Sequence, residues 1–355
     1  MIPNSSFITI DDNLEKIERF INEIIIEPKH SLSRWATITN QTPAAKIGYI
    51  GQHLASLITG VQGTGTGARG DDLADGSEVK SCNKVDQVDK CKNCGGRVLR
   101  IEQRCPSCGS FDIDRKDDSK WLFSIRDEHE LNQYKNLNRI VLLLMDYPNF
   151  DDGDYKDIRI SIFEIYPKEE RMSVFNQLIS NHYYNIFLPK QQDNQKTNPM
   201  NLHPWSFQFY KCNPIKTFEC IIKAIDTTPQ IIIDHNSYIQ PNQNRDNSIM
   251  PIPMPSKLLN DKEWDELLEK ADYETEIVPL FDEDAIKKYE TRIVPLFEKD
   301  VLNNNLSKLT LVQFAQMRSK DKCIILPYLN QKLRDYISLR PIISTRQKNH
   351  YQRGS

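Results

Sequence analysis

Apolar side chains recur every three or four residues near the start of the chain, in residues 11–27. This spacing places them on one stripe of an amphipathic helix, which Pro28 is expected to end. A second helix is predicted at residues 42–59, with Thr42 as its N-cap and Gly60 as the residue that follows its last turn. The stripe of the first helix consists of Leu14, Ile17, Phe20, Ile21 and Ile24.

Two strands are predicted in the middle of the chain. Residues 139–146 (RIVLLLMD) contain an unbroken apolar run at 140–145, which is typical of a buried strand. Residues 157–166 (DIRISIFEIY) alternate between polar and apolar side chains, which favours a half-exposed strand. Helices are predicted at residues 124–134 and 170–180. We assign these elements to the core and no catalytic role to them.

The pattern weakens after residue 189. Residues 190–201 are polar and predict a connector, whereas the aromatic residues of 205–210 and the apolar run 230–233 are strand-like. Residues 236–256 are rich in Asn, Gln and Pro and predict a long exposed loop. Such a loop is either an ordinary connector or a functional segment.

Charge is distributed unevenly along the 355 residues, although the formal net charge is only −3. Acidic residues predominate from 259 to 300, a segment that contains the duplicated sequences 273–284 and 289–300. Basic residues predominate from 318 to 355, which predicts either a phosphate-contacting surface or a solvated tail. Because no apolar stretch approaches the ~20 residues that span a bilayer, we expect a soluble, cytoplasmic protein without a membrane partner.

The most informative segment is residues 70–81, GDDLADGSEVKS. Strand alternation places Glu78 and Lys80 on one face, because side chains point to opposite faces with period two. A tight turn at Asp75-Gly76 brings an upstream aspartate, Asp71 or Asp72, toward the same point. Two carboxylates beside an ammonium predict a Mg²⁺ site that can activate water and stabilise charge on an attacked phosphodiester.

A second group with metal-binding chemistry is formed by four cysteines in two C-x₂-C pairs. Glycines follow each pair and permit the tight turns that direct both sulfurs at one ion. The spacing predicts a tetrahedral Zn²⁺ site that is structural, since protein ligands fill every position. The insert, residues 89–111, is similar to a zinc ribbon, and its Arg97, Arg100 and Arg104 either contact phosphate or have no role. The ligands are Cys91, Cys94, Cys105 and Cys108.

The order of motifs in residues 43–85 resembles the MutH-like and MamI-type endonucleases of the PD-(D/E)xK superfamily. In that superfamily a KGxxGxxLE helix precedes a glycine-containing loop, an aspartate and E-x-K. The resemblance implies an α/β fold of the restriction-endonuclease type, an α+β mixed sheet flanked by helices with the Cys₄ ribbon inserted. It also implies a Mg²⁺-dependent catalytic group of Asp72 (or Asp71), Glu78 and Lys80.

The chain departs from this pattern in three places. The helix glutamate of the family falls on Ala55, so Gln52 or His53 replaces it, or nothing does. The lysine of the helix is displaced by one residue. Asp71 keeps the spacing of the family to Glu78, whereas Asp72 keeps the apolar residue that follows the aspartate; we favour Asp72.

The resemblance implies a type II restriction endonuclease that cleaves double-stranded DNA, as a homodimer matching palindromic sites. Residues 1–189 are expected to form the nuclease core with its ribbon, and residues 202–355 a second region for DNA recognition or dimerisation. Two alternatives stay open: a MutH-like repair endonuclease that nicks one strand, and a zinc-ribbon DNA-binding protein without catalysis.

Overall fold

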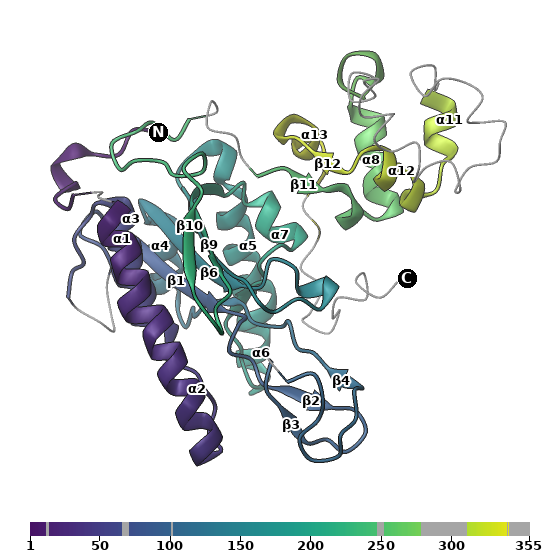
Figure 1. Cartoon of the computed structure of the whole chain (residues 1–355). Coiled ribbons are helices and arrows are strands. Elements are labelled where there is room, and N and C mark those ends of the chain that lie inside the picture. The colour runs from purple at the N-terminus through teal and green to yellow at the C-terminus, as the bar shows by residue number, and fades with distance from the viewer. Residues whose placement is uncertain are drawn as a thin grey trace. The chain divides into compact units, whose positions relative to one another are not determined.

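The structure, a computed structural model, describes residues 1–11, 14–65, 71–100, 102–246, 252–277, 311–338 and 340 (Figure 1). The chain divides into two units, residues 1–204 with 214–250, and residues 205–213 with 251–355. Among the described residues, no helix is long and apolar enough to cross a membrane. The duplication in residues 273–300 and the basic tail beyond residue 340 lie largely outside the described residues.

The first unit is built on a five-stranded sheet with the strand order β1-β6-β7-β9-β10. Strands β1 and β6 are parallel, while every other neighbouring pair is antiparallel, so the sheet is mixed. This confirms the α/β fold with a mixed sheet flanked by helices. The strands are β1 (Ser77–Asn83), β6 (Arg139–Asp146), β7 (Ile158–Ile165), β9 (Ile215–Lys223) and β10 (Gln230–Ile233).

Helices cover both faces of this sheet (Figure 1). On one face, Val141 and Leu143 of β6 pack with Leu54 and Ile58 of helix α3 (Ile47–Thr59) and Ile17 of helix α1 (Leu14–Ile21).

On the opposite face, aromatic rings make edge contacts, with centroids 6.5 Å apart for Trp121–Phe163 and 5.1 Å for Phe123–Phe175. Because β6 is covered on both sides, all eight of its residues are buried, as its unbroken apolar run predicted.

The first predicted helix does not end at Pro28. Helix α1 continues through the π-helical turn η2 (Asn22–Ile26) into helix α2 (Glu27–Thr39). Pro28 lies in the first turn of α2, where a missing N–H and a fixed φ are tolerated. The wider π-helical turn before Pro28 therefore lets the continuous helical segment 14–39 pass a residue that normally stops a helix.

The second predicted helix begins later than Thr42. Helix α3 starts at Ile47 after Lys46, and it ends as predicted at Gly60, whose φ is +68°. Pro43 and Ala45 line the same apolar pocket as Leu32 of α2. The chain before α3 therefore packs against the preceding helix and does not form a first helical turn of its own.

Two predictions around the central strands need correction. Strand β7 is buried at every residue except the half-buried Arg159, because both of its faces are covered: Ile160 and Ile162 lie in the core with α1 and α3, and Phe163 packs against Trp121. The helix predicted at 124–134 is α4 (Glu128–Asn136), which starts where the Asp127 side chain accepts the N–H of Glu130. Residues just before it form strand β5 (Trp121–Phe123), which pairs with β8 (Met200–Leu202).

The helix predicted at 170–180 is present as the short turn η4 (Glu170–Met172) and helix α5 (Val174–His182). The loop predicted at 236–256 is not wholly exposed, since Arg245 is fully buried against Glu164. The other elements of the first unit outside the ribbon are η1 (Ser5–Phe7), η3 (Phe150–Asp152), η5 (Tyr183–Phe187) and α6 (Leu188–Gln192).

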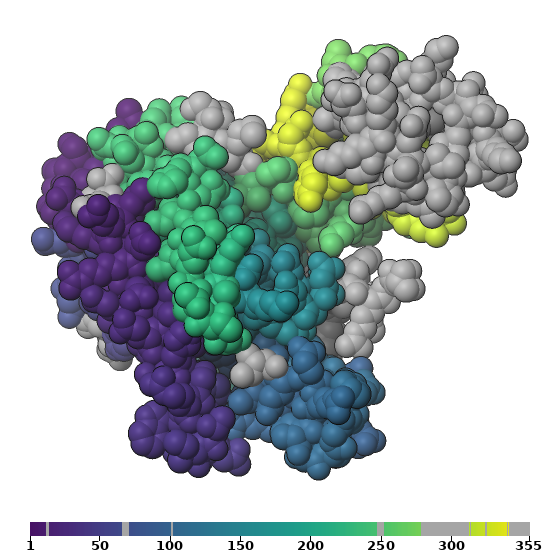
Figure 2. Space-filling model, in the orientation of Figure 1, coloured from purple at the N-terminus to yellow at the C-terminus, as the bar shows by residue number. Residues whose placement is uncertain are grey.

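The cysteine insert forms its own small sheet, with the order β3-β2-β4. Its strands are β2 (Asp89–Cys91), β3 (Arg97–Val98) and β4 (Ile113–Asp114), and its core consists of Val98 with two of the cysteines. Figure 2 shows the ribbon on the surface beside α2. Arg97 makes this contact, because its guanidinium donates to the carbonyl oxygens of Asn40 and Gln41 at 2.7 and 2.6 Å.

The second unit begins with helix α7 (Phe207–Lys211), so the strand predicted at 205–210 is wrong. The Ser206 side chain accepts the N–H of Phe209 and caps the helix. The boundary predicted at residue 202 also differs, because β9 and β10 belong to the sheet of the first unit. The other described elements are β11 (Met254–Pro255), η6 (Ser256–Leu258), α8 (Asp261–Lys270), η7 (Tyr273–Ile277), α11 (Leu311–Gln316), α12 (Ser319–Ile325), β12 (Tyr328–Leu329) and α13 (Gln331–Asp335).

Candidate active site and cysteine cluster

A tight turn precedes strand β1. The N–H of Gly76 donates to the carbonyl oxygen of Leu73 at 3.0 Å, and Gly76 has a φ of +78°, which a residue with a Cβ rarely adopts. Leu73 then pairs with Ser77 in an antiparallel bridge. The turn therefore folds the acidic segment back along β1, as Asp75-Gly76 predicted.

Asp72 is held against β1 by both of its carboxylate oxygens. Its Oδ2 accepts the backbone N–H of Val79 at 2.7 Å, and its Oδ1 accepts Nε2 of Gln52 at 2.5 Å. Burial raises the pKa of Asp72 above its ordinary value, although these two hydrogen bonds act in the opposite direction. Asp72 thus faces the strand that carries Glu78 and Lys80.

Asp71 occupies a different environment. Its side chain is exposed, and its backbone carbonyl oxygen accepts the hydroxyl of Thr64 at 2.6 Å. Its carboxylate is near enough to contribute to the raised pKa values of Asp72 and Glu78. The turn therefore places Asp72 against β1 and Asp71 at the exposed edge of the same group.

Glu78 and Lys80 lie on one face of β1, as strand alternation predicted. They form an ion pair, with 15% and 24% of their side chains exposed. Burial raises the pKa of Glu78. Burial alone would lower the pKa of Lys80, but electrostatic interactions with Glu78, Tyr134 and Asp72 outweigh that effect, so the pKa of Lys80 is raised. Lys80 is therefore a protonated ammonium in a largely enclosed, acidic site.

Tyr134 of α4 is a site residue that the sequence did not reveal. The ammonium of Lys80 lies 5.8 Å from the centroid of its ring, and burial raises the pKa of Tyr134. The ring also packs edge-on against Phe123 at 5.7 Å. Since the tyrosine lies on a helix predicted only as a core element, no local pattern marked it.

Helix α3 contributes Gln52 to this group, whereas His53 and residue 55 do not take part in it. Ala55, where the resemblance places a glutamate, is fully buried in the apolar core. His53 is exposed, and its ring lies 6.1 Å from that of Phe20 on α1. Of the two replacements that the sequence left open, only Gln52 contacts an acidic residue of the site.

A network of buried charged residues stabilises the turn at Asp75-Gly76. Arg139, the first residue of β6, donates to Asp75 at 2.6 Å and to the hydroxyl of Ser77 at 3.0 Å. Its guanidinium also lies 3.4 Å from Glu164, which pairs with Arg245 at 3.2 Å. Asp75 is thus a structural residue. The only signal for this role in the sequence was Arg139, a charged residue at the start of an apolar strand.

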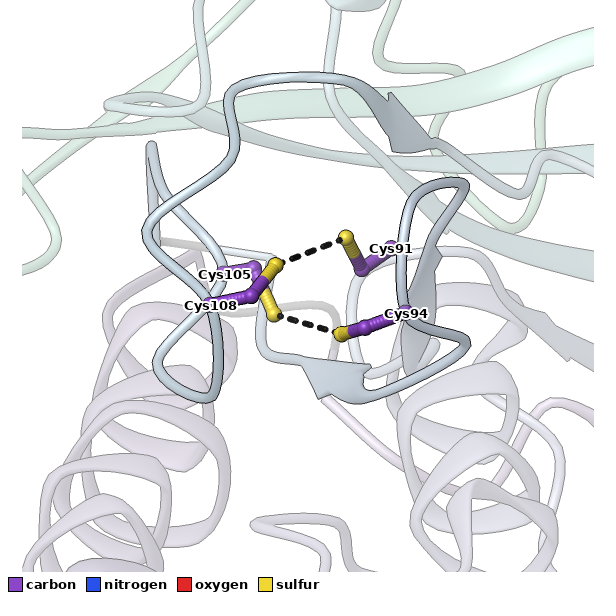
Figure 3. A group of neighbouring side chains, drawn as sticks. All are labelled: Cys91, Cys94, Cys105 and Cys108. Atoms are coloured by element: carbon purple, nitrogen blue, oxygen red, sulfur yellow. Dashed lines mark hydrogen bonds between the residues drawn. The ribbon is translucent and has the colours of Figure 1, made fainter.

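The four cysteine sulfurs form one cluster, shown in Figure 3. All four Sγ atoms lie within 4.8 Å of one another, with separations of 3.6 Å for Cys91–Cys108 and 3.5 Å for Cys94–Cys105. Zinc–sulfur bonds of ~2.3 Å in a tetrahedron put sulfurs about 3.8 Å apart. The cluster therefore fits a single Zn²⁺, as the spacing predicted.

Two matching turns hold these cysteines. The N–H of Gly95 donates to the carbonyl oxygen of Cys91 at 2.9 Å, and that of Gly109 to Cys105 at 2.8 Å. Both glycines have positive φ, +71° and +72°. A backbone N–H from Gly96 also reaches Sγ of Cys94 at 3.4 Å, an interaction that favours the thiolate.

The arginines of the ribbon have different partners. Arg100 is buried, 3.3 Å from Asp89, so it is unavailable for phosphate. Arg104 is exposed, and its guanidinium stacks 4.3 Å from the ring centroid of Phe111. With Arg97 bound to the end of α2, only Arg104 of the three remains a candidate for contact with another molecule.

Comparisons with known proteins place the chain in a family. The family model described as "MamI restriction endonuclease" matches residues 34–257. The "Type II restriction enzyme MamI" of Microbacterium ammoniaphilum is 30% identical over 162 residues, 41% of this chain and 46% of that protein. The chain thus spans about half the length of this curated relative. No solved structure matches the chain.

Proposed function

The chain belongs to the MamI restriction endonuclease family, and from that premise we propose that it is a type II restriction endonuclease. It hydrolyses phosphodiester bonds of double-stranded DNA at a specific sequence. The observation that carries this proposal is the convergence of Asp72, Glu78 and Lys80 beside β1. In this proposal they form the Asp–Glu–Lys group of a PD-(D/E)xK nuclease.

Asp72 and Glu78 are the proposed ligands of Mg²⁺. This hard cation prefers carboxylate oxygens as ligands. Burial leaves both carboxylates poorly solvated in the absence of a cation. Bound Mg²⁺ would supply a polarised water and neutralise charge on the phosphate. Asp71, exposed at the rim, adds negative charge to the site and is the weaker candidate for a ligand.

Lys80 is proposed to act as a fixed positive charge. Its raised pKa keeps it protonated, so it orients the attacking water and stabilises the charge that develops on the phosphate. A role as the base that takes a proton from water is disfavoured by the same shift. The ion pair with Glu78 and the ring of Tyr134 hold the ammonium in place.

The cysteine cluster is proposed to bind one structural Zn²⁺, separate from the chemistry. Because four sulfurs fill a tetrahedral site, no position is left for water or phosphate. The second unit is proposed to serve DNA recognition or dimerisation, and the active form to be a cytoplasmic homodimer. Two-fold symmetry would match a palindromic site and cut both strands.

Substitution of the proposed catalytic residues tests this function. Glu78→Ala and Lys80→Ala should each lower the rate of Mg²⁺-dependent plasmid cleavage by about 100-fold or more, since several kcal/mol of transition-state stabilisation is lost. Glu23→Ala and Arg19→Ala are matched controls, because these residues form an exposed ion pair on the N-terminal helical segment 14–39. Full activity in either catalytic variant would refute the assignment. Wild-type product that stays nicked would instead favour a single-strand endonuclease.

A further inference from the structure

We infer that Gln52 is the third protein ligand of the catalytic metal, supplying its amide oxygen where related enzymes use a glutamate. This inference rests on the proposed function. Gln52, a neutral side chain on α3, would take the role of the helix glutamate that is missing at Ala55.

The geometry of α3 excludes a carboxylate at the usual place. Residue 55 points into the core with Leu54 and Ile58 and is 0% exposed. Gln52 lies three residues earlier, close to one helical turn, and is only half-buried. The helix therefore reaches the site through residue 52.

The contact between Gln52 and Asp72 places the amide group within the distance that separates two neighbouring metal ligands. The amide nitrogen and Asp72 Oδ1 are 2.5 Å apart. Adjacent oxygens around an octahedral Mg²⁺ at ~2.1 Å are about 3 Å apart. Rotating the amide by half a turn exchanges its nitrogen and oxygen without moving the rest of the side chain. A cation next to Asp72 would repel the NH₂ group and favour the oxygen.

The charge of the site explains why an amide suits this position. The site already carries three carboxylates, those of the half-buried Asp72 and Glu78 and of the exposed Asp71. A further carboxylate from α3 would add repulsion before the metal arrives. The amide oxygen contributes a hard donor without adding negative charge.

Metal binding without DNA tests the inference. Zinc-loaded protein is titrated with Mn²⁺, and free Mn²⁺ is followed by electron paramagnetic resonance. Gln52→Leu, which keeps the size but removes the oxygen, should weaken binding on the order of tenfold. Gln52→Glu, which keeps an oxygen but cannot donate to Asp72, should bind as tightly as wild type or more tightly. Thermal melts of both variants establish that the fold is intact.

The outcomes separate this inference from the proposed function. Equal weakening by Gln52→Leu and Gln52→Glu would mean that Gln52 only donates to Asp72, which overturns it. Wild-type binding in Gln52→Leu, with weak binding in Asp72→Asn, would overturn it while leaving the metal site intact. A wild-type protein that binds no Mn²⁺ at this site would contradict both.

Discussion

Helix α3 meets strand β1 where Gly51 faces Ser81, and a Cβ at residue 51 would lie 1.9 Å from the Ser81 Oγ and 3.0 Å from its Cβ. Each of these residues adjoins a residue of the site, Gln52 in the helix and Lys80 in the strand. The glycine therefore sets the distance at which α3 presents Gln52 to Asp72. This close approach gives a physical reason for glycine at that point of the helix.

The first prediction concerns this contact. Gly51→Ala should destabilise the protein by about 1–3 kcal/mol, because the new methyl group overlaps Ser81. Gly48→Ala on the same helix is the matched control, since nothing lies within 4 Å of its Cβ position. It should be neutral or stabilise by up to about 1 kcal/mol. Urea denaturation measures both; equal stability of the two variants would refute the close packing.

The second prediction distinguishes the two aspartates. Asp72→Asn should reduce DNA cleavage by about 100-fold or more, because a proposed metal ligand loses its charge. Asp71→Asn should change the rate by less than about tenfold, since its carboxylate is exposed at the rim. Cleavage rates at saturating Mg²⁺ measure the difference. The reverse order of effects would show that the spacing to Glu78, and not the contact with Val79, identifies the ligand.

The third prediction is a pH dependence. Burial raises the pKa of Asp72 and Glu78, so both take up protons at a pH above the ordinary range of about 4. Protons compete with metal for these oxygens; as pH falls, the Mg²⁺ concentration for half-maximal cleavage should therefore rise. Lys80, with its raised pKa, keeps its charge throughout this range. Rate profiles at several Mg²⁺ concentrations test this. A loss at low pH that added Mg²⁺ does not reverse would contradict it.

The fourth prediction concerns zinc. The protein should purify with one Zn²⁺ per chain, and Cys91→Ser should lose it and unfold the ribbon. The effect should be large, because zinc contributes about 10 kcal/mol or more to folding of isolated zinc peptides. Cys82→Ala, a buried cysteine outside the cluster, should retain the metal. Elemental analysis with limited proteolysis gives the answer, and metal-free wild-type protein with reduced thiols would refute the site.

What the sequence predicted well depends on local chemistry. The strand at 139–146 was recognisable because burial on both faces demands apolar residues throughout. The turn at Asp75-Gly76 and the two cysteine turns were recognisable because a positive φ demands glycine. Such constraints act within a few residues, so one sequence is enough to show them.

The remaining features depend on contacts between distant segments. Gln52 and Asp72 are twenty residues apart, and only the packing of α3 on β1 decides between Gln52 and His53. Asp75 and Arg139 pair over 64 residues, which makes Asp75 structural although it stands among the acidic residues of the motif. Strand β9 joins the sheet through partners far along the chain, so the boundary between the units was misplaced.

Mapping the ends produced from phage DNA of known sequence tests the central claim most directly. Purified protein in Mg²⁺ should produce discrete double-strand fragments whose ends share one sequence, and Lys80→Ala should produce none at the same concentration. The same reaction in EDTA should leave the DNA intact, because Asp72 and Glu78 act through the metal. Intact DNA in Mg²⁺ would contradict the account, as would a smear without a common sequence or cleavage that persists in EDTA.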